Sequence, residues 1–358
     1  MRIVYDDRGG SVQHSSGTHV YMQQLAEAMR RLGVTMEPLF HNAPINPMSL
    51  SVGIKGLKRF AHGFWERSKE YKAAMATKPD VFITAYPNFF PRLYGVPRVL
   101  HLQDLAFIRE PGSYNSLKSR YWRWSIGKAL AQFEGAISIS AFTRQDAAKI
   151  YGDSVAAIPV IHHGVAAAYH STAPQSLRLE PLQFVGIGAH HPRKRWPLGV
   201  EIIAALREKG VDAWLDLIGP YGADTEKIEA TIAKHNLNSR VRVLGVLPQD
   251  ALVRAMKSAS ALLWTSSFEG FGFPVAEAMA AGVPVFSVSN SSIPEITAGA
   301  YTQLLDAPQS AADAIITALN NPAQLFDQTL TAHSTAQRYT WERAARETLK
   351  VWEEIARK

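Results

Sequence analysis

Short apolar runs and longer amphipathic segments alternate along most of this chain. Runs such as Ala213–Ile218 and Ala261–Thr265 are mostly hydrophobic, as strands buried on both faces of a parallel sheet are. The segments between the runs repeat apolar residues at helical spacing. The pattern therefore predicts an α/β protein with doubly wound parallel sheets.

The expected elements fall into two series. In the first half we expect strands at Arg2–Tyr5, Thr35–Phe40, Val81–Thr84, Arg98–Gln103, Ala136–Ser140 and Ile158–His162. The helices expected there are Thr18–Leu32, Leu57–Met75, Leu117–Gln132 and Ala141–Tyr151. In the second half the expected strands are Gln183–Ile187, Ala213–Ile218, Val241–Leu244, Ala261–Thr265 and Val283–Ser287. The helices expected there are Pro197–Lys209, Asp224–His235, Gln249–Lys257 and Trp341–Arg357.

The alternation pauses once, at Ala166–Pro181, which has the composition of a linker. We therefore expect a first Rossmann-like domain at 1–168, a linker at 169–181 and a second Rossmann-like domain at 182–338. A C-terminal helical segment, 339–358, completes the chain. Two such domains facing each other place a ligand cleft at the carboxyl ends of both sheets.

Composition and charge narrow the classes of protein. The chain of 358 residues has no cysteine, which excludes disulfides and thiol catalysis and fits a reducing, cytoplasmic compartment. No apolar run reaches the ~18 residues of a membrane span, and no signal peptide is evident. Residues 1–170 hold 20 Lys and Arg against 12 Asp and Glu, whereas the remainder holds 18 against 19. The first half therefore carries a net charge of +8 and the remainder −1, which together give the +7 of the whole chain.

Two glutamates eight positions apart lie in the most informative stretch, SSFEGFGFPVAEAMAAGVPV at 266–285. A strand, a glycine-containing turn and a helix with Pro274 in its first turn place Glu269 in the turn and Glu277 one turn into the helix. Gly282 falls where a helix end favours glycine. Taken alone, the two glutamates would be a turn residue and an exposed helix carboxylate.

The surrounding residues favour a different interpretation, because the stretch closely resembles the donor-site motif of the family 4 retaining glycosyltransferases. In that family two glutamates separated by seven residues frame a Gly-Phe-Gly turn. The matching residues are Glu269, Gly270, Phe271, Gly272, Pro274, Glu277, Ala278, Gly282, Pro284 and Val285. The resemblance implies the GT-B architecture of two facing Rossmann-like domains, with the C-terminal helix crossing back to the first domain.

The resemblance also implies a role for each residue of the motif. Glu277 would bind the ribose hydroxyls of the donor, and Glu269 the hydroxyls of its sugar. The turn Gly270–Phe273 would place backbone N–H groups near the sugar and phosphate.

Two further segments match the family. His190–Lys194 (HHPRK) follows a predicted strand and Gly188, and Arg193 and Lys194 would there stabilise the leaving diphosphate. Many members have an Arg where this chain has Ala189, and Arg193 could compensate. Gly17, at the start of the first expected helix, would approach the diphosphate from the opposite domain.

One segment departs from the family. A His-Asp pair common after the fourth strand is here Gln103 and Asp104, and Gln cannot titrate. We retain a catalytic role for Asp104 and a binding role for Gln103. His101, two residues earlier, is either a substitute for the missing histidine or an ordinary strand-end residue.

The resulting hypothesis is a metal-independent retaining glycosyltransferase. It would move a hexosyl or deoxyhexosyl unit, with mannosyl slightly favoured, from a nucleotide-diphosphate sugar. The acceptor would be a growing surface glycan of the O-antigen kind, either lipid-linked or not. The alternatives are a nucleotide-sugar 2-epimerase and a catalytically silent sugar-nucleotide-binding protein. No Asp-x-Asp motif or metal-ligand spacing occurs, so neither metal nor other cofactor is expected.

The basic first half leaves two interpretations open. Basic amphipathic segments at Lys55–Lys72 and Lys118–Lys128 are either solvated faces or a peripheral docking surface for an anionic membrane. No nucleic-acid-binding motif occurs, and no nucleic-acid partner is expected.

Overall fold

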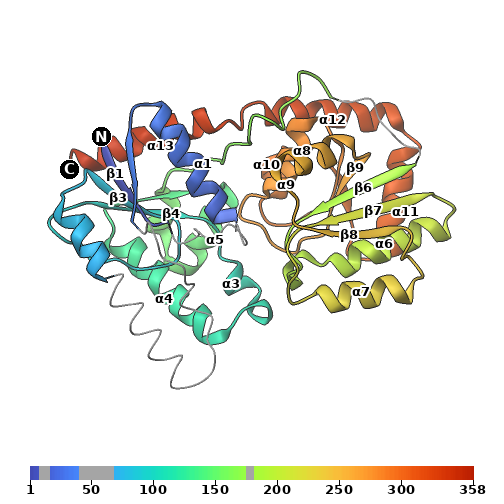
Figure 1. The fold of residues 1–358 in the computed structure, drawn as a ribbon, viewed down its shortest axis with the longest axis horizontal. Helices are drawn as coiled ribbons and strands as arrows, with labels where there is room; N and C mark the ends of the chain where they lie inside the picture. Colours follow the sequence, from blue (N-terminus) through green and yellow to red (C-terminus); the bar gives the residue numbers. More distant parts are fainter. Residues whose placement is uncertain (8–16, 40–67, 175–180) are drawn as a thin grey trace.

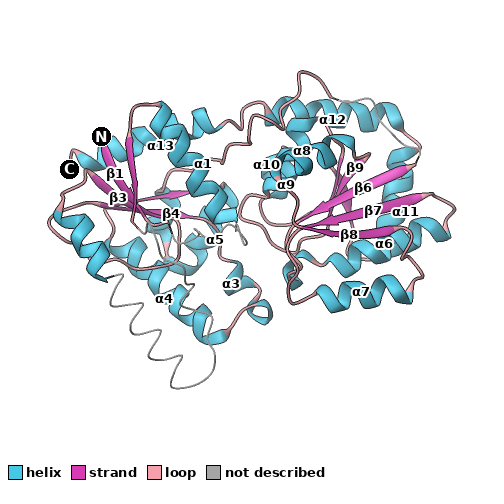
Figure 2. Cartoon of the chain, in the orientation of Figure 1, coloured by secondary structure: helices cyan, strands magenta, loops and turns pink. Residues whose placement is uncertain are grey.

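The structure, a computed structural model, describes residues 1–7, 17–39, 68–174 and 181–358. It consists of two α/β units beside each other, each built on a parallel sheet (Figures 1 and 2). This is the predicted fold class. The predicted linker lies partly outside the described residues.

The first unit holds a sheet of five strands in the order β2-β1-β3-β4-β5. Its strands are β1 (Arg2–Tyr5), β2 (Thr35–Pro38), β3 (Val81–Thr84), β4 (Arg98–Leu102) and β5 (Gly135–Ser138). Its helices are α1 (Gly17–Arg31), α3 (Ala106–Arg109), α4 (Ser116–Gln132) and α5 (Ala141–Tyr151), with the 3₁₀ turns η1 (Pro111–Ser113) and η2 (Asp153–Ala157). Every residue of β3 and β4 is buried, as expected for central strands covered on both faces.

The second unit holds a sheet of six strands in the order β11-β10-β9-β6-β7-β8. Its strands are β6 (Leu182–Ile187), β7 (Ala213–Ile218), β8 (Val241–Gly245), β9 (Ala261–Trp264), β10 (Val285–Val288) and β11 (Thr302–Leu304). Its helices are α6 (Trp196–Glu208), α7 (Thr225–Lys234), α8 (Gln249–Ser258), α9 (Phe273–Ala281), α10 (Ile293–Thr297), α11 (Pro308–Leu319) and α12 (Pro322–Ala336). The 3₁₀ turn η3 (Pro192–Lys194) precedes α6.

The last helix, α13 (Trp341–Ala356), runs back to the first unit (Figure 1). Its apolar face, which includes Trp341 and Trp352, joins the same buried cluster as Ile3 and Val99 of the first sheet. Both ends of the chain therefore lie at the end of the molecule that holds the first sheet (Figure 1).

The chain passes between the units next to this helix. Val165 and Thr340 form a parallel bridge, and Gly164 packs against the backbone of Trp341. A β-carbon at Gly164 would lie 2.3 Å from the Trp341 nitrogen, so the two crossing segments fit together only with glycine there.

One expected strand is not formed, and one expected helix lies partly outside the described residues. The expected strand Ile158–His162 is wrong, because only Val160 bridges Ser138 of β5 there. Pro159 has no N–H to extend a ladder. Of the expected helix Leu57–Met75, residues 57–67 lie outside the described residues, and the remainder is helical.

No helix in the described ranges combines the length and the apolar character needed to cross a membrane.

Candidate functional site

The loop that leaves β6 supplies two cations. Gly188 follows the strand with a φ of 151°, and a β-carbon there would lie 3.1 Å from Cε of Lys194. Gly188 is therefore required by its backbone angle and by the room that the Lys194 side chain needs. The predicted residues Arg193 and Lys194 lie in η3, at the carboxyl end of the strand.

The segment that leaves β9, residues 265–272, is here called the Glu269 turn. It ends at Gly272, whose φ of 90° is left-handed, and Pro274 follows in the first turn of α9. Gly282, with a φ of 69°, caps the end of that helix. The local structure is the strand, turn and helix expected from the sequence.

Glu269 is buried and joins the two loops. Its Oε1 atom lies 2.7 Å from Arg193 Nη1 and 2.7 Å from Lys194 Nζ. Ser266 Oγ donates to the same oxygen at 2.5 Å, and Lys194 Nζ lies 4.3 Å from the centre of the Trp264 ring. Two mostly enclosed cations, with side chains 15 and 12% exposed, therefore share one carboxylate oxygen.

The charges of this group follow from burial and pairing. Burial favours the neutral acid of Glu269, but Arg193 and then Lys194 outweigh it and lower its pKa to about 2. Burial lowers the pKa of Lys194 to about 8, more than Glu269 restores. Burial also lowers the pKa of Arg193, but the charges of Glu269 and Asp104 outweigh it and raise the pKa. At neutral pH the group consists of one carboxylate and two cations.

The first unit reaches this group through Gly270. A β-carbon on Gly270 would lie 2.4 Å from the Gln103 carbonyl oxygen and 2.8 Å from Cβ of Asp104. Ser140 Oγ donates to the Gly270 carbonyl at 2.7 Å. The Glu269 turn thus touches the carboxyl ends of β4 and β5, as facing sheets require.

Gln103 and Asp104 differ in how their side chains are used. Asp104 Oδ1 accepts from the Ala106 N–H at 3.0 Å, which fixes the chain as it enters α3. Gln103 Nε2 is buried and has no hydrogen-bond partner among the described residues. It is therefore a donor that a ligand could satisfy.

Two phenylalanines of the Glu269 segment form an aromatic cluster between the units. Phe273 and Phe271 lie 4.7 and 4.8 Å from the buried ring of His163, measured between ring centres. Gly17, at the start of α1, faces Phe273, since a β-carbon there would lie 3.8 Å from Phe273 Cδ2. Gly17 therefore approaches the start of α9 from the opposite unit.

Glu277 stands apart from the paired charges. It lies one turn into α9, half-buried, and no hydrogen bond or ion pair within the described parts of the chain holds its carboxyl group. Burial raises its pKa to about 8. The structure thus places one ionised and one largely neutral glutamate on the same turn and helix.

Tyr114 of the first unit is a site residue that sequence reasoning missed. Its ring lies 5.3 Å from that of His191, between centres. Burial raises its pKa to about 12, against the charge and hydrogen bond of Arg193. Tyr114 lies in the turn between η1 and α4, where no spacing or motif marks it in the sequence.

The structure decides between the two interpretations of His101. The ring is buried, its Nδ1 atom contacts the Tyr21 hydroxyl, and Trp352 donates to Nε2 at 3.1 Å. Burial lowers its pKa to about 3. His101 is a core residue that anchors α13 and does not replace the missing site histidine.

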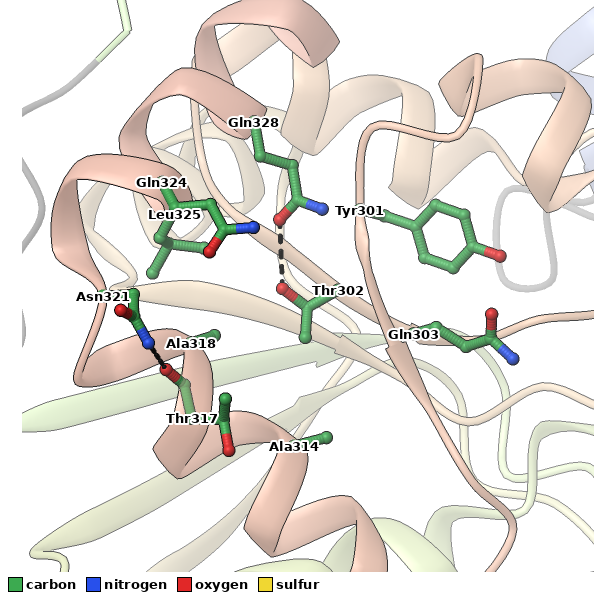
Figure 3. Close-up of a pocket in the computed structure, with 10 residues that line it drawn as sticks. All are labelled: Tyr301, Thr302, Gln303, Ala314, Thr317, Ala318, Asn321, Gln324, Leu325 and Gln328. Atoms are coloured by element: carbon green, nitrogen blue, oxygen red, sulfur yellow. Dashed lines mark hydrogen bonds between the residues drawn. The ribbon is translucent and has the colours of Figure 1, made fainter.

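The described residues include no group of three His, Asp or Glu side chains that could hold a metal ion. A hollow between β11, α11 and α12 is lined by amide, hydroxyl and alanine side chains such as Gln303 and Asn321 (Figure 3). It has no charged residue among its lining and includes none of the residues described above.

Comparisons with known proteins cover both units. Residues 15–169 match the family described as "Glycosyltransferase Family 4", and residues 172–335 match "Glycosyl transferases group 1". Glycogen synthase of Mycobacterium tuberculosis is 23% identical over 94% of this chain and 82% of its own length. O-antigen chain mannosyltransferase B of Escherichia coli is 24% identical over 74% of this chain and 72% of its own.

The fold is also found among solved structures. HepE of Anabaena, in complex with UDP and glucose, superposes with a TM-score of 0.74 at 16% identity. The likeness covers 99% of this chain and 100% of that one.

Proposed function

The chain belongs to the family 4 glycosyltransferases of the GT-B fold, and on this premise we propose that it transfers a hexosyl or deoxyhexosyl unit from a nucleoside-diphosphate sugar to a surface glycan. The mannosyltransferase among its relatives supports a mannosyl donor, and its description supports an acceptor of the O-antigen kind. The solved complex of HepE with UDP and glucose supports a diphosphate nucleotide as the leaving group.

The observation that carries the proposal is the sharing of one Glu269 oxygen by Arg193 and Lys194. Buried cations are stable only when an anion neutralises them. A donor diphosphate can take over both cations, because it offers several charged oxygens to a planar guanidinium and an ammonium. Glu269 is then free to accept hydrogen bonds from the hydroxyls of the donor sugar.

The proposed transfer retains the configuration of the sugar. The bond between the anomeric carbon and the phosphate oxygen breaks, and the acceptor oxygen bonds to the same face of that carbon. The acceptor proton passes to the departing phosphate oxygen, so no protein side chain has to titrate. Glu269, whose pKa is lowered to about 2 chiefly because Arg193 and Lys194 outweigh its burial, suits an acceptor of hydrogen bonds. Arg193 and Lys194 stabilise the charge that develops on the phosphate.

The two alternative functions differ in how well the relatives and the sequence support them. The relatives named above are a transferase and a synthase, which gives the epimerase hypothesis no support. The silent binding protein stays an alternative because Gln103 replaces the histidine common in the family.

A panel of labelled donors tests the proposal. Purified protein is incubated with UDP-, GDP-, dTDP- and ADP-sugars, with and without a glycan acceptor extract. We expect label in the acceptor with one nucleotide class. A released epimer would instead indicate an epimerase, and nucleotide binding without either product would indicate a silent protein.

The same assay tests metal independence. Fixed cations at the diphosphate make a divalent metal unnecessary, so EDTA should leave turnover within about twofold. A strict requirement for Mg²⁺ or Mn²⁺ would overturn this part of the proposal.

We further propose that the enzyme docks on an anionic membrane through α4. Leu117, Tyr121 and Trp124 recur at helical spacing on this helix and are 68, 38 and 52% exposed. An exposed aromatic and aliphatic stripe beside cations is typical of interfacial helices. The cations beside it are Arg120, Arg123 and Lys128, which line a groove with Trp124. The other basic segment, 55–72, lies mostly outside the described residues.

Vesicle sedimentation tests this surface. Wild-type protein should bind phosphatidylglycerol vesicles at low salt and be released at high salt, since the attraction is screened over about 10 Å at 0.1 M. Replacing Arg120, Arg123 and Trp124 by Ser should abolish binding. Replacing the exposed Lys227 and Lys234 of α7 by Ser, as a matched control, should not. If the wild-type protein does not bind the vesicles at low salt, the exposed face of α4 is a solvated surface and not a membrane-docking site.

A further inference from the structure

Glu295 is a residue of the second unit whose carboxylate is used by the first unit. It lies in α10, and its Oε1 atom accepts from the Ala141 N–H at 2.8 Å. Its Oε2 atom accepts from the Phe142 N–H at 2.9 Å. These two amides open α5, so a side chain of one unit binds two of the helix-start donors of the other.

A third bond comes from the segment that connects the units. His162 Nε2 lies 2.7 Å from Glu295 Oε1. Burial raises the pKa of Glu295, but His162 and the two backbone amides outweigh it, so the pKa is lowered. Glu295 is therefore ionised at neutral pH, and all three of its bonds are charge-assisted.

The same segment of the second unit also holds the Glu269 turn. Ser291 Oγ accepts from the Glu269 N–H at 2.9 Å, and Ser292 Oγ donates to the Glu269 carbonyl at 3.1 Å. Both serines directly precede α10, which carries Glu295.

The start of α5 also contacts the Glu269 turn, through a hydrogen bond from the first unit. Ser140 Oγ accepts from the Thr143 N–H at 3.0 Å as the helix cap and donates to the Gly270 carbonyl at 2.7 Å. The path from Glu295 through α5 and Ser140 to Gly270, and back through Ser291 and Ser292, is thus continuous.

We propose that Glu295 is a positioning residue: by holding the start of α5, its carboxylate sets the Glu269 turn against Gln103 and Asp104 of the opposite unit. The inference rests on the proposed function only where turnover is measured. Its first test needs neither donor nor acceptor.

That first test measures the separation of the units. The chain has no cysteine, so spin labels can be placed at Ala73→Cys and Ala230→Cys, both exposed, one in each unit. Double electron–electron resonance should give one narrow distribution of the distance between the two labels in the otherwise wild-type protein. Glu295→Gln should broaden it and shift it to longer distances, because an amide cannot accept from all three donors.

Two further variants make the test specific. Glu354→Gln, an exposed change on α13, should leave the distribution as in the wild type. Ala141→Pro removes the N–H that Glu295 Oε1 accepts while suiting the first position of a helix. It should broaden the distribution less than Glu295→Gln does, and it carries the test if Glu295→Gln fails to fold.

The second test uses turnover. Glu295→Gln should lower kcat by roughly tenfold, because small misplacement of reacting groups is costly. Nucleotide affinity should change less than twofold, since the nucleotide site lies in the second unit. A distance distribution identical to wild type in both Glu295→Gln and Ala141→Pro would overturn the inference, whatever the enzyme's substrates are.

Discussion

At the scale of single residues, the site is a small charge cluster with an excess of cations over its one shared carboxylate oxygen. Lys194 is the more replaceable cation structurally, because Glu269 keeps Arg193 when Lys194 is removed. A lost charge-assisted hydrogen bond costs ~1.5–3 kcal/mol, and more when the bond tightens in the transition state. We therefore expect Lys194→Ala to lower kcat by roughly 10²-fold or more with the fold intact.

The measurement is steady-state turnover with the donor that the labelled panel identifies. Lys234→Ala, which removes an exposed lysine of α7, is the matched control and should be neutral. Activity of Lys194→Ala within twofold of wild type would remove Lys194 from the site.

We propose that Glu277 binds the ribose hydroxyls of the donor, and its titration would then give nucleotide binding a pH dependence. Burial raises its pKa to about 8, so the free protein at pH 7 holds it mostly as the neutral acid. Ribose hydroxyls that donate to the ionised form would lower this pKa on binding. Nucleotide affinity should thus rise with pH below about 8, by at most about tenfold per unit, and protons should be released.

Calorimetry at pH 6 and 7, in two buffers of different ionisation enthalpy, measures both effects below the pH where Lys194 loses its charge. Glu277→Gln should abolish the proton release and flatten the affinity. Proton release that persists in Glu277→Gln would point to another group.

At the scale of elements, prediction from the sequence succeeded where burial is local. Strands such as Arg2–Tyr5 and Val81–Thr84 have the predicted bounds, because continuous apolar runs between polar turns define them. In the second unit α10, α11, α12 and β11 were not predicted. The short α10 and the edge strand β11 lack a full hydrophobic period.

The contacts of the site are likewise of two kinds, those within one segment of the sequence and those between distant segments. Glu269 and Glu277 share one segment, so their spacing predicts their relative position. The contacts of Glu295 with Ala141 and of Tyr114 with His191 join residues far apart in the chain, and only the packing of the two units brings them together.

Gly270 allows a test of that packing. Its φ is not left-handed, so its lack of a side chain serves the close approach of Gln103 and Asp104. Gly270→Ala would place a β-carbon 2.4 Å from the Gln103 carbonyl oxygen. We expect turnover to fall by at least tenfold while nucleotide affinity stays within about twofold.

Gly199→Ala is the matched control for Gly270→Ala. Gly199 lies in α6, and a β-carbon there would make only ordinary contacts, the nearest with Leu263 at 3.7 Å. A Gly270→Ala enzyme with normal turnover would show that the turn is not held against the first unit during catalysis.

At the scale of the whole molecule, buried histidines between α13 and the first sheet link stability to pH. Burial lowers the pKa of His101 to about 3, below the ~6.5 of an unfolded chain. The unfolded state then binds more protons below pH 6.5, so this residue's contribution to stability is lost as pH falls, by up to about 1.4 kcal/mol per unit. The contribution of Glu277 to stability changes with pH in the opposite direction and is lost as pH rises, because its pKa is raised in the folded protein.

The test therefore compares variants. The free energy of unfolding is measured by denaturant titration at pH 7, 6 and 5 for wild type and His101→Gln. The difference in the free energy of unfolding between wild type and His101→Gln should become smaller as pH falls. A gap that is constant across this range would mean that His101 is accessible to protons in the folded protein.

The return of α13 to the first unit also sets the order in which the protein can be built during translation. Trp341, Trp352 and Ile355 belong to the apolar core of the unit that is synthesised first. Until that helix leaves the ribosome, the first unit has an uncovered hydrophobic face, whereas the second unit already has all its strands and most of its helices. The unit made first is thus completed last, and the face that waits for α13 is where a chaperone would be expected to bind the nascent chain.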